Sequence, residues 1–135
     1  MAIAENLNRL NQELPRQVQL VAVSKTMPVS AIREAYAAGQ RDFGENRVQE
    51  LLTKEAQLPS DIRWHLIGHL QTNKVRMAVP MVHLIHSVDS LKLLETIEIE
   101  SARIGRVVDC LLQIRIAREE TKFGMCPEDA EALFR

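Results

Sequence analysis

The stretch LVAVSKT, residues 20–26, joins a short apolar run to a lysine at its carboxyl end. The longer run VQLVAVS, residues 18–24, lacks strict alternation and is typical of a strand buried on both faces of a parallel sheet. Burial disfavours the charged form of a lysine, and a neutral amine can form a Schiff base with an aldehyde. Position alone nevertheless favours the simpler interpretation, in which Lys25 begins a solvated loop.

Strand-like and helix-like segments alternate along the rest of the chain. The predicted strands are VQLVAVS (18–24), RDFG (41–44), DIRWHLIG (61–68), MVHLIHS (81–87) and VVDCLLQIRI (107–116). The predicted helices are an N-terminal helix ending at Pro15, a helix that Pro28 begins, ENRVQELLTKEA (45–56), LQTNKVRMA (70–78), a helix capped by Asp89 or Ser90, and a helix that Pro127 begins. This alternation predicts a parallel sheet with crossover helices. It fits either an open doubly wound sheet or part of a (β/α)₈ barrel.

Composition narrows the class of protein. The chain has 135 residues, one ordinary domain by length, and its net charge of −1 does not suggest a nucleic-acid or membrane-surface partner. No apolar run is long enough to predict a membrane span. Cys110 and Cys126 form no C-x-x-C motif. Their number and spacing fit a reduced compartment, so we expect a cytoplasmic protein.

Polar residues gather where the predicted strands end, the functional edge in both architectures. Loops at strand ends are polar by default, so this pattern is a weak signal. No phosphate-binding glycine motif is present, and the simplest role for Gly44 and Gly68 is to permit tight turns. Ser87, His69 and Asp89 could make a triad only on paper, because no nucleophile elbow is present.

The histidines do not predict a metal site. His65 and His69 have the spacing of a helical zinc pair, but WHLIG indicates a strand, in which four residues span about 13 Å. His83 and His86 are expected on opposite faces of the next strand. Hydrogen-bonded histidines of the core or loops are the simpler interpretation, above all for His65 and His83.

Five blocks of sequence carry a family resemblance. In chain order they are AVSKT (22–26) followed by Pro28, GQRDFGENRVQE (39–50), WHLIGHLQTNK (64–74), IHSVDS (85–90) and EETKFG (119–124). Together they resemble the pyridoxal phosphate homeostasis proteins, also called PLP-binding proteins. Each block alone is weak evidence for the family, but five blocks in the same order are specific to it. The resemblance covers the chain from Val18 to Gly124.

The resemblance implies a TIM (β/α)₈ barrel of the alanine racemase N-terminal type. Residues 1–135 would then be a single domain holding about the first five βα units. The resemblance also implies pyridoxal 5′-phosphate (PLP) bound as a Schiff base to Lys25, which reverses the inference from position alone. The implied pocket residues are Asn46, His65, His69 and Ser87, with Met125 approaching the cofactor ring.

The implied function is non-catalytic: to carry, buffer or deliver PLP and to influence vitamin B6 and amino-acid/keto-acid balance. A PLP-dependent racemase or decarboxylase of the same fold is the alternative, and it needs a second acid/base, often a tyrosine. The chain has one tyrosine, Tyr36, on the apolar stripe of a predicted helix. A third alternative is an open-sheet binding module without a cofactor. No protein partner is named by the sequence, and the full-length protein is expected to be a monomer.

The chain departs from the family in length. A full barrel takes about 250 residues, and the family's Ser/Gly-rich and Arg-x-Gly phosphate segments are absent from these 135. We therefore expect a fragment or a truncation that retains PLP weakly.

Overall fold

A computed structural model describes residues 2–116 and 124–134 of the chain. Its sheet has five strands: β1 (Ala22–Val23), β2 (Asp42–Glu45), β3 (Arg63–Leu66), β4 (Val82–Val88) and β5 (Asp109–Leu112). Its helical segments are α1 (Ala2–Glu13), α2 (Val29–Ala37), α3 (Val48–Glu55), the 3₁₀ turn η1 (Thr72–Lys74), α4 (Val75–Ala78), α5 (Leu91–Arg103) and α6 (Pro127–Phe134). The block EETKFG lies outside the described residues except for Gly124, and Lys122 lies outside them with it.

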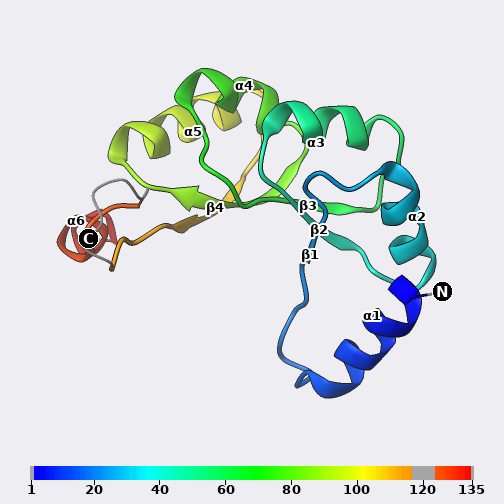
Figure 1. The fold of residues 1–135 in the computed structure, drawn as a ribbon. Coiled ribbons are helices and arrows are strands. Elements are labelled where there is room, and N and C mark those ends of the chain that lie inside the picture. The colour runs from blue at the N-terminus through cyan, green and yellow to red at the C-terminus, as the bar shows by residue number, and fades with distance from the viewer. Residues whose placement is uncertain (1, 117–123, 135) are drawn as a thin grey trace.

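The order of the strands distinguishes between the two predicted architectures. All neighbouring strands are parallel and lie in chain order, β1-β2-β3-β4-β5. A doubly wound sheet would instead reverse its order at a switch point. Parallel crossovers are almost always right-handed, so a consecutive order places the connecting helices α2 to α5 on one face, as Figure 1 shows. The chain forms five consecutive βα units of a TIM-barrel wall of the alanine racemase N-terminal type.

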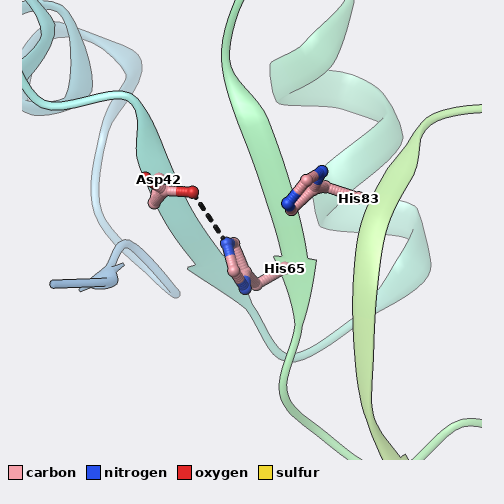
Figure 2. A group of neighbouring side chains, drawn as sticks. All are labelled: Asp42, His65 and His83. Atoms are coloured by element: carbon pink, nitrogen blue, oxygen red, sulfur yellow. Dashed lines mark hydrogen bonds and ion pairs between the residues drawn. The ribbon is translucent and has the colours of Figure 1, made fainter. Parts of the chain in front are cut away.

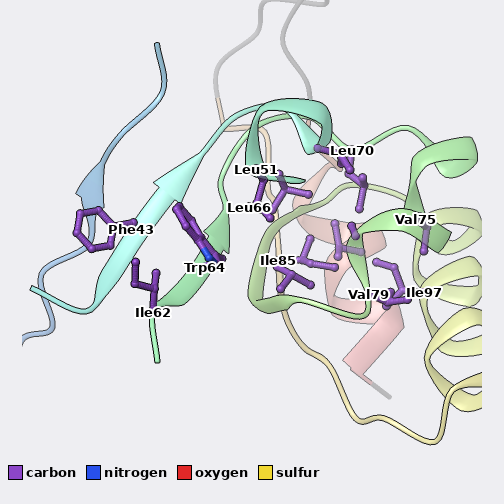
Figure 3. Packing of buried hydrophobic residues seen from close by; sticks show 14 of the residues in the cluster. Phe43, Leu51, Ile62, Trp64, Leu66, Leu70, Val75, Val79, Ile85 and Ile97 are labelled. Atoms are coloured by element: carbon purple, nitrogen blue, oxygen red, sulfur yellow. The ribbon is translucent and has the colours of Figure 1, made fainter. Parts of the chain in front are cut away.

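The core lies between the sheet and this layer of helices (Figure 3). Strand residues such as Phe43, Trp64 and Ile85 point toward the helices and are at most 2% exposed. From the helices, Leu51 and Val75 meet them and are completely buried. Each such side chain contributes about 1.5–3 kcal/mol through burial. The helix layer and the sheet are therefore held together by one continuous apolar core.

Caps and glycines set the ends of several helices. The hydroxyl of Ser90 accepts a hydrogen bond from the Leu93 N–H at 3.1 Å, so Ser90 and not Asp89 caps α5. Gly39 and Gly105 follow α2 and α5 with positive φ angles of 105° and 67°. Pro28 is the N-cap residue of α2, so the helix begins at Val29, one residue later than predicted.

The prediction for the first strand was wrong in one respect. VQLVAVS was expected to be buried on both faces, yet β1 contains two residues and Val23 is 54% exposed. Ala22 packs against the core, whereas Val23 faces the other side of the sheet, because side chains alternate along a strand. Leu111 of β5 is 49% exposed for the same reason. The face turned away from the helices, called here the concave face, is only partly covered.

Within the described ranges, no helix combines the length and the apolarity that crossing a bilayer requires.

Candidate functional site

Lys25 lies in the loop that follows β1, at the carboxyl edge of the sheet. Its side chain is exposed and makes no hydrogen bond or ion pair within the described part of the chain. The next residue, Thr26, has a φ of 61°, which is uncommon for a β-branched residue. Its N–H donates to Oε2 of Glu50 at 2.7 Å. The loop is thus held in a specific conformation while the amine of Lys25 stays accessible.

A buried ion-pair network lies directly beneath this loop. The ammonium of Lys54 on α3 donates to Oε2 of Glu45 at 2.8 Å and to Oε2 of Glu50 at 2.7 Å. It also donates to the carbonyl oxygen of Ser24 at 2.6 Å. The Ser24 hydroxyl donates to the same Glu45 oxygen at 2.5 Å. The hydrogen bond from Lys54 lowers the pKa of Glu50, and the Thr26 N–H lowers it further.

Sequence reasoning missed this network. Both Lys54 and Glu45 fall within the predicted helix ENRVQELLTKEA (45–56), and neither was expected at the site. The spacing of Glu50 and Lys54, four residues apart on a predicted helix, was the available signal for an ion pair. Nothing in the sequence, however, places Glu45 or the Ser24 carbonyl beside them.

The Asn46 backbone packs against Gly68. Asn46 follows β2 and is half-buried, and Gly68 follows β3 on the neighbouring strand. A Cβ atom on Gly68 would lie 2.5 Å from the Asn46 carbonyl oxygen and 2.9 Å from its Cα. Gly68 is therefore required for a close approach of two loops, and its φ is not positive. Gly68 does lie in a bend, as predicted for a turn, but the close backbone contact and not a positive φ explains the need for glycine.

His69 and Asn46 line the same cavity at the carboxyl edge. This cavity has a volume of about 380 Å³, and Arg47 and Lys74 also line it. Its volume lies within the range of small-molecule pockets. Nδ1 of His69 is 3.3 Å from a carboxylate oxygen of Asp89. The structure thus brings two of the six expected pocket residues together.

His65 is buried within the sheet, on its concave face. Its Nε2 lies 3.0 Å from Oδ1 of Asp42 (Figure 2), and its Nδ1 lies 2.8 Å from Nε2 of His86. Arg63 donates to both carboxylate oxygens of Asp42, at 2.9 and 2.7 Å. Burial alone would raise the pKa of Asp42, but hydrogen bonds from Arg63, His65 and Gln19 outweigh it and hold that pKa far below its usual range. Asp42 is therefore an ionised acceptor, and His65 Nε2–H donates to it.

The expectation for His83 and His86 was wrong. Both rings lie close to that of His65, with centroids 5.4 and 5.1 Å away. The pairing of β4 shifts twice, opposite Trp64/His65 and again between Ile85 and Val88. Each shift inserts a residue, so the simple alternation of faces does not hold.

Asp42, His65 and His83 are spaced closely enough to hold a metal ion, with ligand atoms within 4.8 Å of one another (Figure 2). The ligand atoms of Asp42 and His65 are nevertheless already engaged. A cation would have to compete with the Arg63 guanidinium for Asp42 and break one of the two hydrogen bonds of His65. Charge repulsion from Arg63 adds to that cost. The cluster is better explained as a hydrogen-bonded polar layer of the sheet.

Ser87 and Met125 do not line the cavity that Asn46 and His69 share. The Ser87 hydroxyl, in β4, is buried and has no hydrogen-bond partner among the residues described. Met125 is buried and pairs through its backbone with Gln113 and Arg115, beyond the end of β5. Its cavity, of about 330 Å³, is shared with Asp89 at the carboxyl edge. Within the described residues, neither side chain forms a hydrogen bond with Lys25.

Tyr36 lies at the opposite edge of the sheet from Lys25. Its hydroxyl donates to Asp61 at 2.5 Å, and the guanidinium of Arg41 lies 3.7 Å from its ring centroid. Arg41 and Asp61 precede β2 and β3, so this cluster marks the amino edge. The hydrogen bond to Asp61 raises the pKa of Tyr36. This tyrosine is not placed to act on a group bound at Lys25.

The sequence matches one protein family along its whole length. Residues 1–135 match the family described as alanine racemase, N-terminal domain. A pyridoxal phosphate homeostasis protein of Pseudomonas aeruginosa is 43% identical over 120 residues, 88% of this chain and 52% of that protein. The human pyridoxal phosphate homeostasis protein is 40% identical over 141 residues, 97% of this chain and 51% of that protein. The chain therefore spans about half the length of these relatives.

Solved structures agree with this match. PipY of Synechococcus elongatus, in a structure with PLP bound, superposes with a TM-score of 0.91 at 49% identity, covering 98% of this chain and 62% of PipY. Its structure without PLP gives a TM-score of 0.92 at 50% identity, covering 96% and 61%. Alanine racemase of E. faecalis gives 0.76 at 18% identity, covering 99% and 37%, a likeness of fold alone.

Proposed function

Because the chain belongs to the alanine racemase N-terminal domain family, we propose that it binds PLP through a Schiff base on Lys25. One structural observation carries the proposal. Of the four lysines within the described residues, only Lys25 lies in the loop that follows a strand at the carboxyl edge, with an exposed side chain. Lys54 is buried in ion pairs, and Lys74 and Lys92 lie in helical segments. Relatives named for PLP homeostasis and the PLP-bound PipY structure support the choice of ligand.

The residues near Lys25 suit an aldehyde cofactor. Condensation of the Lys25 amine with an aldehyde forms a C=N bond and releases the aldehyde oxygen as water. The exposed amine is accessible for this step, and the loop that holds it is fixed at Ser24 and Thr26. Asn46 offers an amide that both donates and accepts, and His69 lines the same cavity as Asn46. We propose Asn46 and His69 as neighbours of the cofactor, and His65, Ser87 and Met125 as more distant support.

We further propose that the role is to hold and deliver PLP without catalytic turnover, and so to affect vitamin B6 and amino-acid/keto-acid balance. When bound, PLP can stabilise a carbanion, but a racemase also needs a second acid/base. Tyr36 is the chain's one tyrosine and lies at the far edge of the sheet. A sensitive racemisation assay with purified protein separates this carrier from an enzyme of the same fold.

Borohydride trapping tests the proposal. The chain is incubated with PLP, reduced with borohydride, digested and examined by mass spectrometry for pyridoxyl-lysine. We expect the adduct at Lys25, and we expect Lys25→Ala to abolish it while the fold is retained, because an exposed lysine contributes little packing. Lys92→Ala, at an exposed lysine of α5, is the matched control. An adduct that maps mainly to Lys74 or Lys122 would contradict the assignment.

A further inference from the structure

We propose that Lys54 is a positioning residue that fixes the backbone on both sides of Lys25 and thereby sets where the Lys25 amine lies. The inference rests on the proposed function of Lys25. It assigns a role to a buried cation, whose side chain is only 7% exposed and lies on an otherwise apolar helix face. Lysine is almost never buried in this way unless it is paired.

The three hydrogen-bond donors of the Lys54 ammonium are all used. Two of them bind the carboxylates of Glu45 and Glu50. The third binds the carbonyl oxygen of Ser24, the residue before Lys25. Glu45 is completely buried, so the attraction between the two charges is screened less than in a surface pair. Helix α3 is thus joined by ion pairs and a hydrogen bond to the Lys25 loop at the carboxyl edge.

The same network reaches the other side of Lys25. The Glu50 oxygen that accepts from Lys54 also accepts from the backbone N–H of Thr26. Lys25 is therefore flanked by one residue fixed directly by Lys54 and one fixed through Glu50. Thr26 has a positive φ, an unfavourable conformation that persists only where surrounding contacts impose it. Without Lys54, the loop is expected to relax toward an ordinary backbone conformation and carry the amine away.

Three variants distinguish a positioning role of Lys54 from a contribution to the stability of the fold. Lys54→Met removes the ammonium and keeps the apolar stem, but it leaves the Glu45 carboxylate buried without its cation, which can unfold a protein. The double variant Lys54→Met/Glu45→Gln removes both charges. Glu50→Ala leaves the bonds from Lys54 to Glu45 and Ser24 in place, and removes the Lys54–Glu50 pair together with the link to Thr26. Lys92→Met is the matched control, because Lys92 is an exposed lysine on α5.

Each variant is trapped with PLP and borohydride, and pyridoxyl-lysine at Lys25 is measured relative to that at Lys92, or to that at Lys74 in the Lys92 variant. Circular dichroism and urea unfolding establish that the variant is folded under the trapping conditions. We expect the Lys25 share to fall about tenfold or more in folded Lys54 variants, in the range that small misplacements of a reacting group produce. We expect a smaller fall in Glu50→Ala and none in Lys92→Met.

Amide hydrogen exchange supplies a readout that global destabilisation does not reproduce. In the folded Lys54 variants and in Glu50→Ala, exchange should become faster in the peptide containing Ser24 to Thr26 and stay unchanged in the central strands. An unchanged Lys25 share and unchanged exchange at this peptide, in a folded Lys54→Met/Glu45→Gln or Glu50→Ala variant, would overturn the inference. Absence of a Lys25 adduct in the unmodified chain would instead refute the proposed function, while the exchange measurement would still test the role of Lys54 on the loop.

Discussion

The loop after β3 lies so close to the loop after β2 that Gly68 has no room for a side chain beside the Asn46 backbone. An added Cβ would lie 2.5 Å from the carbonyl oxygen of Asn46. The obstacle is backbone, which cannot move aside as the end of a flexible side chain can. The position of Asn46 at the carboxyl edge therefore depends on a glycine from the neighbouring strand.

Gly68→Ala should destabilise the protein and displace Asn46. We expect the free energy of unfolding to fall by about 1–3 kcal/mol, the usual cost of overpacking, as measured by urea denaturation. PLP retention should weaken with it. Gly44→Ala is the control, because its Cβ would meet the Ile67 and Val21 side chains at 3.2 and 3.3 Å, and side chains can adjust. Equal losses in the two variants would contradict the importance of the Asn46 contact.

Asn46→Ala should weaken PLP binding without abolishing the adduct at Lys25. If the Asn46 amide pairs with the bound cofactor, losing it costs about 1–3 kcal/mol, because a buried polar group is left unpaired. Fluorescence titration with PLP measures the change in affinity. Asn73→Ala provides a control at an exposed asparagine in η1. An unchanged affinity in Asn46→Ala would count against direct contact.

Asp42 should make the stability of the protein depend on pH in the acid range. Its pKa in the folded protein lies well below the unfolded value of about 4. A carboxylate of this kind stabilises the fold fully above its unfolded pKa and loses that contribution as the pH falls toward its folded pKa. We therefore expect the free energy of unfolding to decline below about pH 4.

Asp42→Asn checks the origin of that decline. The amide cannot be ionised, so the variant should be less stable at neutral pH and its stability should change less between pH 4 and lower values than that of the unmodified chain. Urea denaturation at a series of pH values measures both effects. An identical acid decline in the two proteins would assign the pH dependence to other carboxylates.

Local patterns predicted the elements well because each has a local cause. Ser90 and Gly105 delimit α5, and the apolar runs give the strands. The strand order came only from the structure, since an alternating pattern suits both an open sheet and a barrel. The grouping of His65, His83 and His86 depends on two irregularities in β4, which regular alternation does not reveal. The contact of Lys54 with Ser24 joins residues 30 apart in sequence, and no spacing rule predicts it.

The concave face determines how residues 1–135 should behave when produced alone. In a complete barrel this face is filled by side chains from all the strands. Here Val23 and Leu111 are 54% and 49% exposed, and β1 and β5 each have only one strand neighbour within the described residues. Exposed apolar surface and unpaired strand edges favour association. We therefore expect these residues alone to be of low stability or to self-associate, as analytical ultracentrifugation would measure.

The same residues alone should bind PLP much more weakly than full-length relatives, although Lys25 is present. A Schiff base is reversible, so retention depends on holding the phosphate as well. In TIM barrels the phosphate is frequently bound by loops after the seventh and eighth strands, and the described sheet has five. Equilibrium dialysis of the 135-residue chain against PLP, with a full-length relative in parallel, measures the difference. Tight, stoichiometric retention by a monomer of this length would show that the phosphate site lies within residues 1–135, and the cavity lined by Arg47 and Lys74 would then be the first place to substitute.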